Sequence, residues 1–161
     1  MAVVLVRIDD RLIHGQVVEG WVPVFRVQRI VVASEPAAAD PTYRALMALS
    51  VPEEVALEVL PVAQAAKALE GPGVAADRTL VLVAGPQEAL ALLDAGARFD
   101  SLNVGGLHYA AGTLQIGKAI FLSDEDMRAL DSIAARGVRI EGRAVPGDTP
   151  VDVLSLMRTK A

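Results

Sequence analysis

The chain has 161 residues, of which 53% are hydrophobic and only 4% are aromatic, and it contains no cysteine. This length suits one domain, residues 1–161, with a full hydrophobic core, and the missing cysteines exclude disulfides, thiol catalysis and cysteine-ligated metals. The formal net charge of −5 gives no argument for nucleic-acid binding.

The apolar segments are short and are interrupted by charged residues, proline or glycine, so the sequence predicts no transmembrane span. The apolar start at residues 1–4 has no basic segment before it. We therefore expect no signal peptide and a cytoplasmic location.

Strand-like and helix-like segments alternate along the chain. Short aliphatic runs, typical of strands buried on both faces, cover 3–8, 29–33, 55–60, 79–84, 101–104 and 138–143, with a short extended segment at 118–122. Helices are expected over 15–22, from Pro41, over 61–69, from Pro86, over 123–136 and over 151–157. The alternation predicts a single-domain α/β fold, an open doubly wound sheet that is mostly parallel and has helices on both faces.

Helix boundaries are marked by specific residues. Asp40 before Pro41 is a helix start, and Ser123 followed three residues later by Asp126 resembles a capping box. Pro23 should end the first helix, and Gly71-Pro72-Gly73 should form a surface turn.

The segment 7–16 (Arg-Ile-Asp-Asp-Arg-Leu-Ile-His-Gly-Gln) follows the first predicted strand and carries the main candidate site. His14 is the candidate catalytic residue, because imidazole is a good nucleophile for a group carried briefly. Arg7 and Arg11 lie four residues apart and are expected to bind the same oxyanion. A lone histidine after a strand is more often a loop or core residue, but this one falls where the fold predicts a site.

In an open α/β sheet, ligands bind beyond the carboxyl ends of the strands, where the strand order reverses. If a helix begins near Gly15, its free N–H groups favour an anion, so Gly15 and Gln16 are further candidate phosphate ligands. Asp9 or Asp10 could accept a hydrogen bond from the ring of His14 and fix its tautomer.

A second candidate loop, residues 103–109, follows another predicted strand. Gly105 and Gly106 permit positive φ angles and could form an anion-binding nest, or they could simply make a tight turn. His108 is either a second site residue or a half-exposed loop histidine. Trp21 is expected in the core or at an interface.

These residues resemble a known family. Segment 7–17, with Gly20-Trp21 after it, is similar to the N-terminal signature of enzyme IIB of the bacterial phosphotransferase system, in its mannose/fructose/sorbose family. The resemblance covers essentially the whole chain. The matching segments beyond the signature are Asp40-Pro41, Asn103 to Gly106, Leu122 to Asp126, Ala135 to Arg139 and Val145-Pro146.

The resemblance implies a protein-histidine:sugar phosphotransferase subunit. His14 would accept a phosphoryl group from phospho-IIA and pass it to a sugar transported by IIC and IID. Arg7 and Arg11 would hold the phosphate, Asp9 and Asp10 would be polar supports, and the covalent phosphohistidine would need no metal or other cofactor. The protein would be cytoplasmic and associate peripherally with the membrane permease.

Some positions depart from the family pattern as we expect it. Ala33-Ser34-Glu35 and Ala84-Gly85 follow two strands where acidic or amide residues and a Lys-Asn-like pair are expected, and 106–109 belongs to a less familiar branch. The sugar, and whether the role is transport or a regulatory relay, stay open.

Two other functions compete. A Rossmann-like nucleotide- or anion-binding regulatory module would use the glycine loops, although the first turn lacks Gly-x-Gly-x-x-Gly. A metal-dependent hydrolase would use Asp9, Asp10, His14 and His108. The surplus of apolar residues also leaves a homodimer open.

Overall fold

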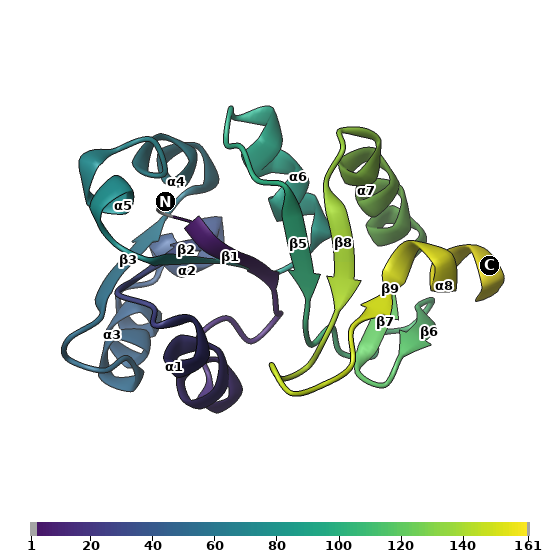
Figure 1. The fold of residues 1–161 in the computed structure, drawn as a ribbon, viewed down its shortest axis with the longest axis horizontal. Helices are drawn as coiled ribbons and strands as arrows, with labels where there is room; N and C mark the ends of the chain where they lie inside the picture. The colour runs from purple at the N-terminus through teal and green to yellow at the C-terminus, as the bar shows by residue number, and fades with distance from the viewer. Residues whose placement is uncertain (1–2, 161) are drawn as a thin grey trace.

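A computed structural model describes residues 3–160, and these build around one mostly parallel sheet (Figure 1). Its seven strands run in the order β3-β2-β4-β1-β5-β8-β9, and only β9 is antiparallel to its neighbour. The strands are β1 (Val3–Ile8), β2 (Arg29–Ala33), β3 (Ala56–Leu60), β4 (Thr79–Val83), β5 (Ser101–Val104), β8 (Arg139–Gly142) and β9 (Val151–Asp152). The expected fold class is confirmed.

Helices cover both faces of the sheet, which divides the core into two clusters of buried aliphatic side chains. One face carries α4 (Val62–Ala68), α5 (Pro72–Ala76), α6 (Pro86–Asp94), α7 (Asp124–Ala135) and α8 (Val153–Lys160). The other carries a π-helical segment, η1 (Val17–Trp21), with α1 (Val22–Phe25), α2 (Glu35–Ala39) and α3 (Pro41–Ser50). In Figure 1, α4 and α5 lie on one side of β1 and β2, while α1 and α3 lie on the other.

Two predicted helix starts have the expected side-chain caps. The carboxylate of Asp40 accepts from the N–H groups of Thr42 and Tyr43 at the start of α3. The side chain of Ser123 accepts from the N–H of Asp126, and the Asp126 carboxylate accepts from the N–H of Ser123. Both pairs satisfy N–H groups that a helix leaves without intrahelical partners.

Proline was a poor guide to helix ends. The first helix does not stop at Pro23 but continues to Phe25, because Pro23 lies in the first turn of α1, directly after the π-helical segment, where a missing N–H is tolerated. The Gly71-Pro72-Gly73 turn was also wrong, since Pro72 begins the short helix α5 and Val74 is buried in the core.

The chain also forms elements that the sequence reading missed. The helix α2 follows Ser34, whose hydroxyl accepts from the N–H of Ala37. Strand β6 (Leu114–Gly117) was also missed; it pairs as a hairpin with β7 (Ile120–Leu122), which lies within the extended segment predicted at 118–122. Val151 and Asp152, expected in the last helix, instead pair with β8 as β9.

The topology places the end of β1 in the middle of the sheet. Strand β1 pairs with β4 on one side and with β5 on the other, and the chain changes direction across the sheet at this point. The carboxyl ends of three strands therefore meet at one place, as expected for the ligand site of an open α/β sheet. No helix within residues 3–160 is long and apolar enough to cross a membrane.

Candidate functional site

The loop after β1 is fixed on both sides by its neighbouring strands. The N–H of Asp9 donates to Val83 O at the end of β4, and the N–H of Asp10 donates to Gly106 O beyond β5. The side chains of Leu12 and Ile13 are buried, and Leu12 adopts a positive φ of 57°. A nonglycine residue accepts such a conformation only where the surroundings determine it, and here the core holds both side chains.

Asp9 orients the ring of His14. Nε2 of His14 lies 2.8 Å from Oδ2 of Asp9, whose side chain is 0% exposed. An ionised carboxylate only accepts hydrogen bonds, so Nε2 carries the proton and the lone pair of the neutral ring is on Nδ1. Nδ1 is enclosed and has no hydrogen-bond partner in the part of the chain that the structure describes, and the side chain as a whole is 12% exposed.

Arg7 lies behind Asp9 and not at the surface. Its side chain is 0% exposed, and Nη2 lies 3.2 Å from Oδ2 of Asp9. Nη1 donates to Asn103 Oδ1 and to Arg143 O, and Nη2 also donates to Ala144 O. We expected Arg7 and Arg11 to reach one oxyanion together, but the structure gives Arg7 an internal place, where both η nitrogens bind protein acceptors.

These contacts determine the charge state of the pair. Burial alone would raise the pKa of the Asp9 carboxyl, but the hydrogen bond and charge of His14, the N–H of Arg11 and the charge of Arg7 together hold that pKa below its ordinary value. Burial lowers the pKa of Arg7, against the attraction of Asp9. Asp9 is therefore a carboxylate across the physiological pH range.

Arg11 and the first turn of the following helix face outward. The Arg11 side chain is 47% exposed and its Nη2 donates to Gln16 Oε1 at 3.2 Å. The backbone is helical from Gly15 onward, and His14 O accepts from the N–H groups of Val17 and Val18. Among the hydrogen bonds of residues 3–160, the N–H groups of Gly15 and Gln16 have no acceptor, so both are available to an anion beside His14.

In the second loop, the glycines leave room for neighbouring side chains and do not form an anion-binding nest. Neither Gly105 nor Gly106 has a positive φ, so of the two alternatives the anion-binding nest is excluded. A Cβ at Gly105 would overlap the guanidinium of Arg7, with its Nε at 2.9 Å. Only glycine leaves room there for the buried arginine.

Asp10 binds the second loop. Its Oδ1 lies 2.6 Å from Nδ1 of His108, and its Oδ2 accepts from the N–H of the same residue at 2.8 Å. The His108 side chain is 63% exposed. The structure thus places the two predicted loops side by side, with one aspartate for each histidine.

Glu141 and Arg143 were not predicted as site residues, and Asn103 was named only as part of the candidate loop 103–109. Asn103 accepts from Arg7, Glu141 lies 3.4 Å from the Asn103 amide, and Arg143 pairs with Glu141. Asn103 and Arg143 belong to strand ends at the same edge of the sheet, a position that could have identified them. Trp21 is fully buried, as predicted for a core residue, and the guanidinium groups of Arg7 and Arg143 lie over its ring.

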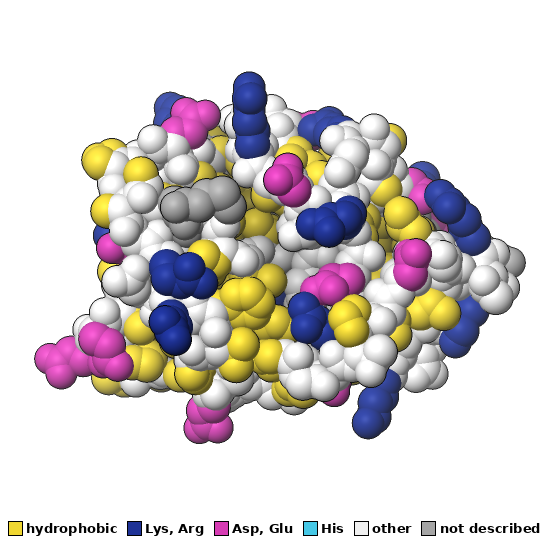
Figure 2. All heavy atoms as spheres, in the orientation of Figure 1, with side chains coloured by type: hydrophobic (Ala, Val, Ile, Leu, Met, Phe, Trp, Pro, Cys, Tyr) yellow, Lys and Arg dark blue, Asp and Glu magenta, His cyan; other side chains and the backbone are white. Residues whose placement is uncertain are grey.

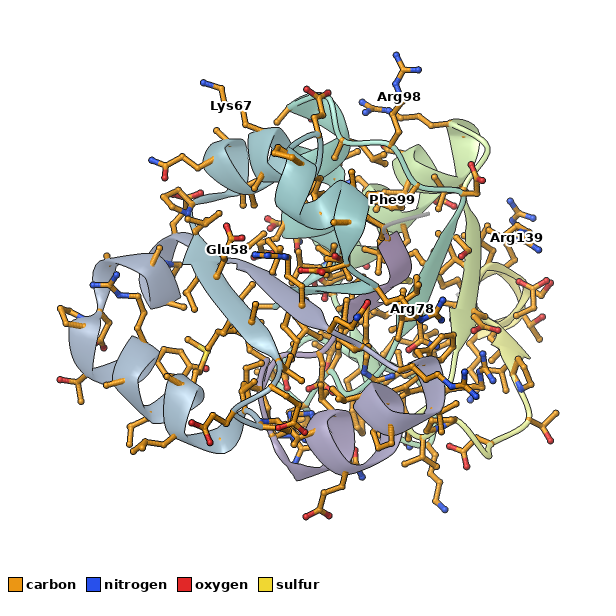
Figure 3. All side chains as sticks on the ribbon, turned by 60° about the vertical axis from the view of Figure 1, so that its left-hand side comes forward. Glu58, Lys67, Arg78, Arg98, Phe99 and Arg139 are labelled. Atoms are coloured by element: carbon orange, nitrogen blue, oxygen red, sulfur yellow. The ribbon has the colours of Figure 1, made fainter. Side chains whose placement is uncertain are left out.

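The part of the chain that the structure describes places no metal centre at this edge, although a cavity of about 290 Å³ lies there beside Gly105, Arg143 and Ala144. Within residues 3–160 no group of three or more His, Cys, Asp or Glu residues is arranged to hold a metal ion. The four proposed hydrolase ligands instead form two separate pairs. A cavity of about 530 Å³ lies at the amino ends of β1, β5 and β8, beside Arg98, Phe99 and Arg139, which Figure 3 labels. It lies at the opposite edge of the sheet from His14.

The chain is similar to a known protein family over almost its whole length. Residues 3–161 match the family model described as the PTS system sorbose subfamily IIB component. The fructose-specific EIIB component of Bacillus subtilis (strain 168) is 32% identical over 158 residues, covering 98% of this chain and 97% of that protein.

Two further similarities extend the match. The mannose-specific EIIAB component of Escherichia coli (strain K12) is 34% identical over 157 residues, and the match covers 98% of this chain but 49% of that protein. The crystal structure of the IIBSor domain of the sorbose permease from Klebsiella pneumoniae superposes with a TM-score of 0.93 at 30% identity, covering 100% of this chain and 99% of that chain.

Proposed function

The chain belongs to the sorbose subfamily of IIB components of the phosphotransferase system, and from this membership we propose that it is a phosphocarrier that accepts a phosphoryl group on His14. The donor is phospho-IIA, and the acceptor is a sugar transported by IIC and IID. The chain then acts as one unit on the cytoplasmic side of the membrane, next to the permease, and carries only the covalent phosphoryl group.

The observation that supports this role most directly is the 2.8 Å contact between Asp9 and His14. Because Asp9 keeps the proton on Nε2, the lone pair on Nδ1 attacks the phosphorus atom of the donor. The donor N–P bond breaks as the Nδ1–P bond forms, and Asp9 stabilises the positive charge that develops on the ring. Nδ1 is enclosed before the reaction, so attack requires a local shift that uncovers it.

Groups next to His14 in the chain can stabilise the transferred phosphoryl group without a metal ion. The N–H groups of Gly15 and Gln16 and the exposed guanidinium of Arg11 supply positive potential from the surface. Apart from its chain neighbours and its own helix backbone, no atom of residues 3–160 lies within 4 Å of the Cβ position of Gly15, which leaves space for the phosphoryl oxygens. Arg7 contributes indirectly by holding Asp9 in place.

The test is phosphorylation of the purified chain by phosphoenolpyruvate, enzyme I, HPr and a cognate IIA. We expect an acid-labile phosphate on the peptide that contains His14, in the Nδ1-phosphohistidine form that ³¹P NMR identifies. His14→Ala should lack this isomer and should transfer nothing to sugar in membranes that contain IIC and IID.

His14→Gln controls for a folding defect in His14→Ala, because glutamine keeps a hydrogen-bond donor for Asp9 but lacks the imidazole. A folded His14→Gln chain without the Nδ1 isomer would locate the acceptor at His14. If the wild-type chain gains no phosphate on the His14 peptide with any IIA partner of the sorbose, mannose or fructose type, the proposal is wrong. Calorimetry with nucleotides would then test the binding-module alternative.

A further inference from the structure

The exposed His108 contacts an aspartate, as the mostly buried His14 does. Asp9 holds His14 and the adjacent Asp10 holds His108, at 2.8 Å and 2.6 Å respectively. The two aspartates are consecutive in one loop, so both pairs lie at the same edge of the sheet. The assigned function uses only the first pair.

The bound nitrogen differs between the two rings. Asp9 contacts Nε2 of His14, whereas Asp10 contacts Nδ1 of His108. A carboxylate takes the proton-bearing nitrogen as its donor, so the neutral ring of His108 has its lone pair on Nε2. Nε2 of His108 has no hydrogen-bond partner among residues 3–160, and the ring is 63% exposed.

The orientation of the His108 ring is determined by more than one contact. The N–H of His108 donates to Oδ2 of Asp10, and the N–H of Asp10 donates to Gly106 O. The Asp10 carboxylate therefore accepts from two groups of one residue, and a reciprocal backbone bond links the two loops. An oriented imidazole with a carboxylate behind it is the arrangement that activates a histidine for attack or proton transfer.

The two pairs are close enough for one partner to reach both. The position that a Cβ would occupy at Gly106 lies 3.7 Å from Oδ1 of Asp9 and 4.0 Å from Cε1 of His108. Asp9 in turn contacts the His14 ring. A protein that brings a phosphohistidine to His14 must cover this part of the surface, because direct transfer requires contact between reacting groups.

We propose that His108 is a second phosphoryl acceptor, through Nε2, an inference that rests on the proposed phosphocarrier function. The Nε2–P bond forms as the N–P bond of the donor phosphohistidine breaks, and the donor nitrogen keeps that electron pair. Asp10 holds the proton on Nδ1 and stabilises the positive ring. No oxidant, water or metal ion is consumed.

The two acceptors give different products, which makes the experiment specific. The wild type, His14→Gln and His108→Gln are incubated with phosphoenolpyruvate, enzyme I, HPr and IIA, and each product is analysed by intact mass, peptide mapping and ³¹P NMR. We expect two acid-labile phosphates on the wild type, an Nε2-phosphohistidine alone on His14→Gln, and an Nδ1-phosphohistidine alone on His108→Gln.

Asp10→Asn is the second variant, because it keeps His108 but removes the carboxylate. It should lower the rate of Nε2 labelling by about tenfold or more, and the Nδ1 label on the same molecule shows whether the loop still folds. Arg136→Gln, at a surface ion pair remote from the site, is the matched control and should keep both labels.

The outcomes separate the two proposals. A phosphate on His14 with none on His108, in the wild type and in His14→Gln, overturns the second acceptor and leaves the phosphocarrier function standing. Slower His14 labelling in His108→Gln without any label on His108 also overturns it, and would assign His108 to donor binding. No phosphate on either histidine contradicts the phosphocarrier function itself.

Discussion

Asp9 holds His14 by Nε2 at 2.8 Å, and Nδ1 of the ring has no hydrogen-bond partner among residues 3–160. The carboxylate is completely buried, whereas the ring reaches the edge of the surface. This relationship assigns different tasks to the two nitrogens: one bears the orienting proton, and the other is free for covalent chemistry.

Asp9→Asn should slow phosphoryl acceptance by His14 by about 10²- to 10⁴-fold, because a neutral amide neither selects the tautomer nor stabilises the charged ring. The measurement is the rate of His14 labelling at saturating phospho-IIA. Asp94→Asn, at an exposed ion pair with Arg136, is the matched control and should react like the wild type. A rate for Asp9→Asn equal to that of the wild type would contradict this role.

The stability of the fold should fall in acid partly because of Asp9. Its pKa is lower in the folded chain than its ordinary value, so the unfolded chain binds more protons in this range. The contribution of Asp9 to the free energy of unfolding is complete above the ordinary aspartate pKa and is lost as pH falls through the folded one, which places the change below about pH 5. The measurement is urea unfolding between about pH 3 and pH 7. The free energy of unfolding should fall less steeply toward acid pH for Asp9→Asn than for the wild type. Parallel curves would refute the prediction.

Substitutions of Arg7 and Arg11 should have different effects on the stability of the fold and on the rate of phosphoryl transfer. Arg7→Met leaves Asp9 with a buried charge and one partner fewer, so we expect the free energy of unfolding to fall by about 3–5 kcal/mol. Arg11→Ala changes an exposed side chain and should cost at most about 0.5 kcal/mol.

The same Arg11→Ala variant should slow phosphoryl transfer on the order of 100-fold, the effect of removing one preorganised oxyanion donor. Denaturant unfolding and single-turnover labelling measure the two effects separately. A destabilised Arg11→Ala, or an Arg7→Met of normal stability, would contradict the structural role of Arg7 and the surface role of Arg11.

Two glycines of the site should respond differently to alanine. Gly105→Ala places a methyl group on the guanidinium of buried Arg7 and should lower the free energy of unfolding by about 1–3 kcal/mol. Beyond its chain neighbours and its own helix backbone, the new methyl of Gly15→Ala meets no atom of the described residues within 4 Å, and Gly15 lies at the start of a helix, so the change should be neutral or stabilising by up to about 1 kcal/mol.

Gly15→Ala should nevertheless slow labelling of His14, because its methyl group enters the space proposed for the phosphoryl oxygens. Thermal unfolding and labelling rates of the two variants check both statements. Normal labelling of Gly15→Ala would place the phosphoryl group elsewhere around the ring.

Local sequence signals were sufficient for much of the fold. The aliphatic segments predicted the six parallel strands of the sheet to within a residue or two, because strands covered by helices on both faces are rich in Val, Ile and Leu. Asp40 and Ser123 marked their helices correctly because capping is an interaction over three residues. Pro23 and Pro72 misled because proline is acceptable in a first helical turn, and the sequence does not show which turn a residue occupies.

The sequence by itself determined the alternating α/β order, the position of the site after the first strand and the residue types in it. Only the tertiary structure decided which contact each of those residues makes: Arg7 is internal, Asp9 binds His14, Asp10 binds His108, and Gly105 leaves room for an arginine. The physical reason is that all of these contacts except Asp9–His14 join β1 and the loop after it to residues 96 to 137 positions away in sequence. Such pairings follow from strand order and side-chain packing, which no local pattern records.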